Sequence, residues 1–478
     1  MTVRATLSAA LLVSTAACAV NPATGEREFS LVSEQQEIAM GREADPQITA
    51  SLGLAENEDL QEYVSDLGLR LAAVSERPDL PWSFKVVDDP IVNAFALPGG
   101  FIYVTRGILA HFASEAELAG VLGHEIGHVT ARHSASQMSR QQLQQIGLGV
   151  GMILSEDVRR FGGLLGAGLQ LLNLSYSRGD ETQSDELGLR YISRLGYDPD
   201  AMIGVFEMLA EAGSGGEEGR VPEWALTHPY PENREENIRE QIAETGVSRD
   251  GTVGVDEYLD RLDGMVYGED PRQGFFEDTR FLHPELEFEL VFPSGWQTVN
   301  QRTVVAAVAP SETAVMTLQV AQEVTDPVAG LRDFLSQEGM SGGVIREDEE
   351  RGVRSARAEF QAVTEQGTLR GEVAFLRHRD LTYGLMGYAD QSNWSQHASE
   401  VGASISSFRP LTDRAALSAQ PLRLEIAELS DAMSLASYHS RNPGPVDLDE
   451  IARLNRHDPN EVLPSGTRIK IVTGERPR

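Results

Sequence analysis

Cysteine and lysine are nearly missing from this chain of 478 residues. It has one cysteine, Cys18, and two lysines, Lys85 and Lys470. One cysteine cannot form an intrachain disulfide, and structural zinc sites closed by four protein ligands usually rely on several cysteine thiolates. A metal site in this chain must therefore rely chiefly on histidine, aspartate or glutamate side chains.

Positive charge is also scarce. The chain has 40 basic residues against 73 acidic ones, a formal net charge of −33 at pH 7. Each contact with a nucleic-acid phosphate needs a cationic side chain, so this composition excludes nucleic acid as a partner. After the N-terminal segment the sequence has no uninterrupted apolar run of the roughly 18 residues that a membrane span needs. Neither a DNA-binding protein nor a multi-span membrane protein is expected.

The most informative stretch is SEAELAGVLGHEIGHVTARH, residues 114–133. Ser114 is a natural helix N-cap, and apolar residues then recur at steps of three and four, which predicts a helix. On that helix His124 and His128 stand one turn apart on one face, in the spacing H-E-x-x-H. Two such imidazoles can bind one zinc ion, while Glu125 reaches the water at an open coordination position. The alternative is two structural histidines in a chance match.

A catalytic zinc site uses three protein ligands and keeps one position for water. The third ligand is expected in YSRGDETQSDELG, at the start of a second amphipathic helix. There Glu181 can complete the ligand set, and Asp185, one turn later, can accept the N–H of a ligating histidine and fix its tautomer. The alternative is that the two carboxylates only complement the dipole at the N-terminus of that helix.

Four motifs in order resemble the gluzincin zinc metallopeptidases that include the CAAX prenyl protease, the HtpX-like proteases and the periplasmic BepA-like proteases. These motifs are NAFALPGGFIYVTRGIL, HEIGH, YSRGDETQSDELG and THPYPENR, and the resemblance covers residues 21–261. It implies that His124, His128 and Glu181 hold one zinc ion per chain, that Glu125 is the base, and that Asp185 supports a ligand. Ser184 stands where the family usually has alanine.

The fourth motif, THPYPENR, contains His228. A residue before proline is biased away from helical geometry, so this side chain can point into a cleft. There it would occupy the open position of the metal as a gate, or donate a hydrogen bond to the oxyanion. The alternative is an ordinary surface turn.

Residues 1–17 have the features of a secretory signal peptide: one early arginine, an apolar run and small residues at their end. Cys18 follows directly and resembles the acylation site of a bacterial lipoprotein, and the alternative is a cysteine beside an ordinary cleavage site. The resemblance predicts a periplasmic protein anchored to the outer membrane, because Ala19 is not the aspartate that retains such lipoproteins in the inner membrane.

The segment before the H-E-x-x-H helix alternates apolar and polar residues and predicts strands joined by turns. Gluzincins commonly lay substrate along a sheet edge next to the metal. The strand that contains Phe101, Ile102 and Tyr103 is therefore our candidate for pairing with a substrate peptide. The alternative is an ordinary covered strand.

We predict an α+β fold in three parts. Residues 21–272 form a mainly helical zinc-peptidase domain with a small edge sheet, and residues 275–410 form an α+β domain on an antiparallel sheet. Residues 420–474 follow a strand, helix, helix, strand pattern that resembles a LysM module, whose usual partner is a polymer of N-acetylglucosamine such as peptidoglycan. The alternative is a retained scaffold that does not bind this polymer, because ELSDAMSLA replaces the usual Gly-Asp-Thr-Leu turn.

The expected function is that of a zinc-dependent metalloendopeptidase of the bacterial periplasm, in quality control or assembly of envelope proteins. Misfolded or assembling envelope proteins would be its substrates. The alternative is a chaperone-like or peptidoglycan-tethered binding protein whose peptidase site is gated shut. An intact Glu125 favours the enzyme, because a retired site has no need of a base.

Overall fold

The computed structural model describes residues 18–147, 176–214, 224, 228, 234–364 and 367–476. The predicted signal peptide and most of THPYPENR lie outside these residues. The chain divides into two compact units: the first combines the described residues up to Gly268 with Leu422–Gly474, and the second is Glu269–Pro421 with the described part of Glu475–Arg478. Both units mix helices with largely antiparallel sheets, which confirms the predicted α+β class. No helix in the described residues is both long and apolar enough to cross a membrane.

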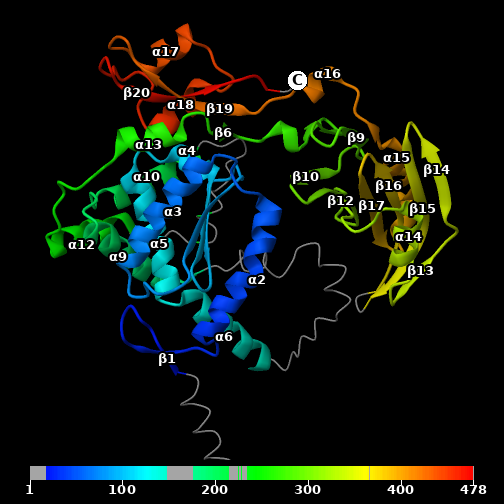
Figure 1. The fold of residues 1–478 in the computed structure, drawn as a ribbon, viewed down its shortest axis with the longest axis horizontal. Coiled ribbons are helices and arrows are strands. Elements are labelled where there is room, and N and C mark those ends of the chain that lie inside the picture. Colours follow the sequence, from blue (N-terminus) through cyan, green and yellow to red (C-terminus); the bar gives the residue numbers. More distant parts are fainter. Residues whose placement is uncertain are drawn as a thin grey trace, which may run out of the picture. The chain divides into compact units, whose positions relative to one another are not determined.

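The first unit holds a small sheet surrounded by helices (Figure 1). Up to the end of that sheet its elements are β1 (Cys18–Val20), β2 (Arg27–Phe29), α2 (Glu34–Leu52), α3 (Glu58–Ala73), β3 (Ser83–Val87), β4 (Ala94–Leu97) and β5 (Phe101–Thr105). The following elements are α4 (Arg106–His111), α5 (Glu115–Thr130), α6 (His133–Gly147), α9 (Arg178–Arg194), α10 (Ala201–Ser214), α12 (Arg234–Thr245), α13 (Val255–Leu262) and β6 (Val266–Tyr267). The sheet has the order β3-β5-β4, and α5 packs against β4.

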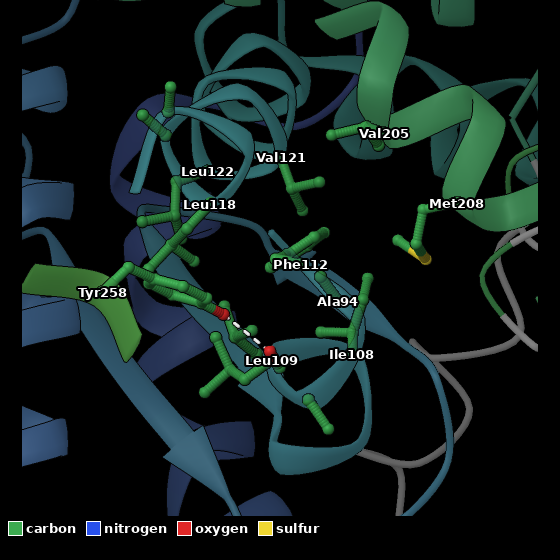
Figure 2. Close-up of a cluster of buried hydrophobic side chains, with 14 of the residues drawn as sticks. Ala94, Ile108, Leu109, Phe112, Leu118, Val121, Leu122, Val205, Met208 and Tyr258 are labelled. Atoms are coloured by element: carbon green, nitrogen blue, oxygen red, sulfur yellow. Dashed lines mark hydrogen bonds between the residues drawn. The ribbon is translucent and has the colours of Figure 1, made fainter. Parts of the chain in front are cut away.

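Helix α5 contains the H-E-x-x-H motif and is the centre of this unit. Ser114 caps it and accepts from the backbone N–H of Glu117, whereas the Glu117 carboxylate accepts from Ala113 rather than from the cap residue. All of its residues are buried, because helices and β4 pack around it. Figure 2 shows apolar side chains of α4, α5 and α10 meeting beside this helix, with Tyr258 donating to the carbonyl of Leu109 at 2.6 Å.

Glycine lets α5 and α9 approach at backbone distance. A Cβ atom on Gly123 would lie 3.1 Å from the Cα of Gly188, and one on Gly127 would lie 3.1 Å from the Cα of Ser184. Larger residues would push the helices apart, since such contacts are tighter than ordinary packing allows. This close approach brings the start of α9 beside the histidines of α5.

The second unit is built on antiparallel sheets. Its first elements are η1 (Pro271–Gln273), β7 (Phe275–Glu277), β8 (Arg280–His283), β9 (Phe288–Val291), β10 (Gln297–Gln301), β11 (Val304–Val308), β12 (Ala314–Val320) and α14 (Pro327–Leu335). They are followed by β13 (Met340–Gly342), β14 (Arg346–Glu350), β15 (Val353–Thr364), β16 (Gly367–His378), β17 (Leu381–Asp390), α15 (Trp394–Ser407), β18 (Arg409–Pro410) and α16 (Arg414–Leu417). The large sheet runs β10-β11-β12-β17-β16-β15-β13, and β14 also pairs with β15; a smaller sheet runs β18-β9-β8-β7. Helix α14 packs on β15 and β16.

The C-terminal segment has the predicted order of strand, helix, helix and strand. It consists of β19 (Leu422–Glu428), α17 (Leu435–Arg441), α18 (Leu448–Asn455) and β20 (Arg468–Thr473). Strand β19 lies between β20 and β6, so its sheet includes residues from the end of the peptidase segment. One apolar core runs from α3 and α5 into this segment. These contacts make it a structural part of the first unit.

Two cations join the C-terminal segment to the chain around the start of α5. The buried ammonium group of Lys470 donates to the carbonyls of Ala110 and Phe112, at 2.8 and 2.7 Å. Arg456 pairs with Glu117 in the first turn of α5. The C-terminal segment therefore braces the end of the helix that holds the H-E-x-x-H motif.

Replacing Lys470 by methionine (Lys470→Met) is expected to flatten the pH dependence of stability. Burial lowers the pKa of Lys470 to about 7, below the ordinary value near 10.4 that the unfolded chain retains. The unfolded state therefore binds more protons between these values, and stability should rise as pH rises. From pH 7 to pH 9 the wild type should gain about 2–3 kcal/mol from this group.

Urea unfolding of the wild type and of Lys470→Met at pH 7, 8 and 9 measures this difference. Lys85→Met, at the only other lysine of the chain, is the matched control and should keep the wild-type slope. Equal slopes for the wild type and Lys470→Met would show that the ammonium group is not buried in solution.

Candidate metal centre

Four side chains from distant parts of the sequence meet in the first unit. His124, His128, Glu181 and His228 each present a ligand atom, and these atoms lie within 4.8 Å of one another. The Nε2 atoms of His124 and His128 are 3.0 Å apart, and the Glu181 oxygens lie 3.6 and 3.4 Å from them. The three predicted zinc ligands are thus neighbours, and His228 joins them.

Glu125 lies beside this set without belonging to it. Its Oε1 atom is 3.4 Å from Nε2 of His228 and accepts from the indole N–H of Trp224 at 3.4 Å. Trp224 and His228 stack at 4.6 Å between ring centroids, and the backbone N–H of His228 bonds to the carbonyl of Trp224. Sequence reasoning missed Trp224, which stands four residues before His228.

Asp185 accepts a hydrogen bond from His124, which is the role predicted for it. Its Oδ1 atom is 2.9 Å from Nδ1 of His124, so Nε2 of His124 faces the other ligand atoms. Arg234 donates to both Asp185 oxygens, at 2.8 and 2.6 Å, and lies 3.1 Å from an oxygen of Glu181. The buried guanidinium therefore compensates the two carboxylates of α9.

Two further residues contact His128. Its Nδ1 atom is 2.9 Å from Nδ1 of His133, and the ring of Tyr176 stacks on it at 3.9 Å. Neither residue was predicted as part of the site. For His133 a signal existed: a third histidine five positions after the motif, at the end of the stretch that predicted the helix.

Burial controls the charge of these groups in the metal-free chain. It raises the pKa of Glu125 to about 8 and that of Glu181 well above its usual range. It lowers the pKa values of His124, His128 and His228, which favours the neutral imidazoles that bind metals. Burial by itself would raise the pKa of Asp185, but Arg234 and His124 together outweigh it and the pKa is lowered.

The donor set fits a divalent cation such as zinc. Glu181 is fully buried, and neither of its oxygens accepts a hydrogen bond from any residue that the structure describes. Two histidine nitrogens and a carboxylate oxygen that converge in this way offer three ligand atoms to one cation. Ligands at about 2.0–2.1 Å from zinc in a tetrahedron lie roughly 3.3 Å apart, close to the observed separations.

The expectation for Phe101, Ile102 and Tyr103 as a substrate-binding edge is wrong. Strand β5, which contains them, is the middle strand of its sheet, parallel to β3 and antiparallel to β4. Its backbone groups are already paired on both sides, so it cannot add a substrate strand. The edge strand that packs against α5 is β4.

Cys18 lies at the start of β1, and its backbone pairs with Phe29. Its side chain is outside the part of the chain that the structure describes, as is the predicted signal peptide before it. Lipidation of Cys18 therefore stays a prediction.

A helix with H-E-x-x-H, whose glutamate Glu125 lies beside the ligand set, and the glutamate Glu181 from a second helix together define a metallopeptidase centre of the gluzincin type. The sequence profile described as "Peptidase family M48" matches residues 58–242, which contain His124, Glu125, His128 and Glu181. The chain belongs to peptidase family M48. The family resemblance seen in the four sequence motifs is thereby confirmed.

Two relatives illustrate the match. The mitochondrial metalloendopeptidase OMA1 of Schizosaccharomyces pombe is 34% identical over 239 residues, which are 48% of this chain and 68% of that protein. The beta-barrel assembly-enhancing protease of Yersinia pestis is 34% identical over 227 residues, which are 46% of each chain. This chain thus spans about half the length of the bacterial relatives that it matches.

Among solved structures, a cyanobacterial PsbP from Synechocystis matches 27% of this chain and 91% of its own, at 13% identity and a TM-score of 0.23. Similarity at this level does not establish a shared fold.

Proposed function

We propose that this chain is a zinc-dependent metalloendopeptidase that acts on envelope proteins. One observation carries the proposal: Glu125, a fully buried carboxylate, lies next to the set His124, His128 and Glu181 without being one of its members. A binding site for a structural metal has no use for such a group, whereas peptide hydrolysis requires a base.

The residues divide the chemistry as follows. His124, His128 and Glu181 would hold a zinc ion, which supplies a polarised water and a Lewis acid for the scissile carbonyl. Glu125 is placed to take a proton from the attacking water and to return it to the leaving amine. Water is thereby added across one peptide bond, with the hydroxyl on the acyl carbon and the proton on the amine.

Substrate would pair with β4, the edge strand that packs against α5. Among the described residues β4 pairs only with β5, so its other edge can accept an extended peptide. The backbone N–H of Trp224 lies 3.4 Å from the carbonyl of Val92, just before this strand. Trp224 thus borders the proposed peptide site.

The relatives support a role in the envelope. Those named beta-barrel assembly-enhancing protease support misfolded or assembling envelope proteins as substrates. Residues 1–17 would direct the chain to the periplasm, and acylated Cys18 would anchor it to the outer membrane. The C-terminal segment would bind peptidoglycan if it is a LysM module. Labelling of the wild type but not of Cys18→Ala with radioactive palmitate tests the anchor.

The activity is tested by casein cleavage with the purified full chain. A chelator should abolish cleavage and zinc should restore it. Zinc content should fall in Glu181→Ala as it does in His124→Ala, because both remove a ligand. Full zinc occupancy of Glu181→Ala would exclude Glu181 from the ligand set.

Removing the His228 side chain (His228→Ala) is expected to raise proteolysis. His228 shares the donor set, and a neutral imidazole binds zinc well, so it can occupy the position that water or substrate needs. Cleavage of casein at equal zinc content measures the effect. A fall of about 10²–10³ in rate would instead assign His228 to the oxyanion, since that is the usual effect of losing such a donor.

The second candidate is a chaperone-like binding protein whose peptidase site is permanently closed. The presence of His228 among the four possible metal ligands supports this candidate, because a fourth protein ligand would fill the position that water needs. It predicts a zinc-loaded chain that cleaves nothing, either as the wild type or as His228→Ala, yet suppresses aggregation of an unfolded outer-membrane protein.

A further inference from the structure

We propose that His133 is a positioning residue of the metal centre, which accepts the Nδ1 proton of His128 and so directs the Nε2 lone pair of His128 at the metal. The inference rests on the proposed function, because it assigns a role beside the same zinc site. His133 itself is not one of the four side chains that could bind the metal.

The position of His133 follows from the turn between α5 and α6. Arg132 adopts a left-handed backbone conformation, with φ of 62°, which is unfavourable for a residue other than glycine. Its side chain donates to Glu37 and to the carbonyl of Val32, at 2.5 and 2.7 Å. These contacts hold the turn, and His133, the first residue of α6, lies against His128 with 2% of its surface exposed.

Hydrogen bonds fix which nitrogen of His133 carries a proton. Its Nε2 atom is 2.8 Å from Oε1 of Gln183, and an amide oxygen can only accept. Nε2 of His133 therefore donates, and its Nδ1 atom accepts in the neutral ring. The bond of 2.9 Å between the two Nδ1 atoms must then be donated by His128.

The consequence for His128 is that its Nε2 atom has a lone pair and no proton. That atom faces Nε2 of His124 at 3.0 Å and an oxygen of Glu181 at 3.4 Å. With the opposite tautomer a proton would occupy this space and exclude a cation. Gln183 lies two residues after Glu181 on α9, so one helical turn supplies both a ligand and the group that orients His133.

The two ligating histidines thus have acceptors of different kinds. His124 donates to the carboxylate of Asp185, which Arg234 compensates, whereas His128 donates to a ring nitrogen of His133. Removing the partner of a ligating histidine typically lowers metal affinity by about 10–100-fold. We expect a loss in this range when His133 can no longer accept.

The test compares His133→Phe with His133→Asn in the full chain. Phenylalanine has no acceptor, whereas the amide oxygen of asparagine can lie near the place of Nδ1. Zinc affinity is measured by competition with a chromophoric chelator, and the visible spectrum of the cobalt-loaded protein reports on ligand geometry. His133→Phe should bind zinc about 10–100-fold more weakly with an altered cobalt spectrum, and His133→Asn should restore most of both.

A second pair of variants covers the case in which His133→Phe does not fold. Gln183 is only partly buried, so Gln183→Leu should fold and weaken zinc binding, while Gln183→Glu keeps an acceptor and should bind like the wild type. Equal zinc affinities of the wild type and Gln183→Leu, or of His133→Phe and His133→Asn, would overturn the proposal. In those cases the zinc content of His124→Ala separates the role of His133 from the proposed function. If His124→Ala loses the zinc that the wild type binds, the proposed function stands without the role of His133. If the wild type binds no zinc, both proposals are overturned.

Discussion

Glu125→Gln is expected to abolish casein cleavage and to leave zinc content unchanged. Glutamine has nearly the same shape but cannot take a proton from water, and losing a general base typically lowers a rate by about 10²–10⁴-fold. Zinc should remain because Glu125 is not among the four side chains that converge as a donor set. Initial rates of casein cleavage and metal analysis of the same samples measure both effects.

Two controls make this result specific. Glu43→Gln removes a carboxylate from the exposed face of α2 and should cleave casein like the wild type. His124→Ala should lose both zinc and activity. Cleavage by Glu125→Gln at the wild-type rate would show that another group is the base and that the proposed mechanism is wrong.

Arg234→Met is expected to destabilise the first unit by about 3–5 kcal/mol, the usual effect of removing one partner of a buried ion pair. The guanidinium is 1% exposed and bonds to both oxygens of Asp185, and it lies 3.1 Å from Glu181. Methionine would leave these carboxylates buried without their cation. Urea unfolding of the zinc-free proteins measures the loss.

Arg239→Met is the matched control, since Arg239 lies on the same helix α12 with about half of its side chain exposed. Its pair with Glu235 is at the surface, where such pairs contribute about 0–1 kcal/mol. If the two variants unfold at the same urea concentration, the contacts of Arg234 contribute no more than a surface pair. Added zinc should recover part of the stability of Arg234→Met, because a cation bound between the carboxylates stabilises the folded state.

The chemistry of the centre could be predicted because its parts are local in the chain. His124 and His128 stand four residues apart, so helical geometry alone places them on one face. Glu181 and Asp185 have the same spacing on a second helix. The structure brings the two pairs together, at distances that depend on close packing at Gly123, Gly127 and Gly188.

The position of strand β5 within its sheet could not be predicted from the sequence pattern. Alternation of apolar residues predicts a strand, but it does not reveal how many neighbours that strand has. Strand β3 pairs parallel with one side of β5, and β4, which lies between them in the sequence, pairs antiparallel with the other side. Strand β5 is therefore the central strand of the sheet. An edge is a property of strand order, which long-range pairing decides.

The sequence by itself therefore determined the type of centre, the family and the α+β class, since each depends on residues that are close in the chain or on a pattern repeated along it. Only the tertiary structure decided that Trp224 adjoins the centre, that Arg234 compensates its carboxylates, and that Lys470 braces the start of α5. Arg234 is 49 residues from Asp185, and Lys470 is 358 residues from Phe112. Contacts over such separations form because burial leaves each charge and polar atom in need of a partner, and which partner lies within reach is set by how the helices pack.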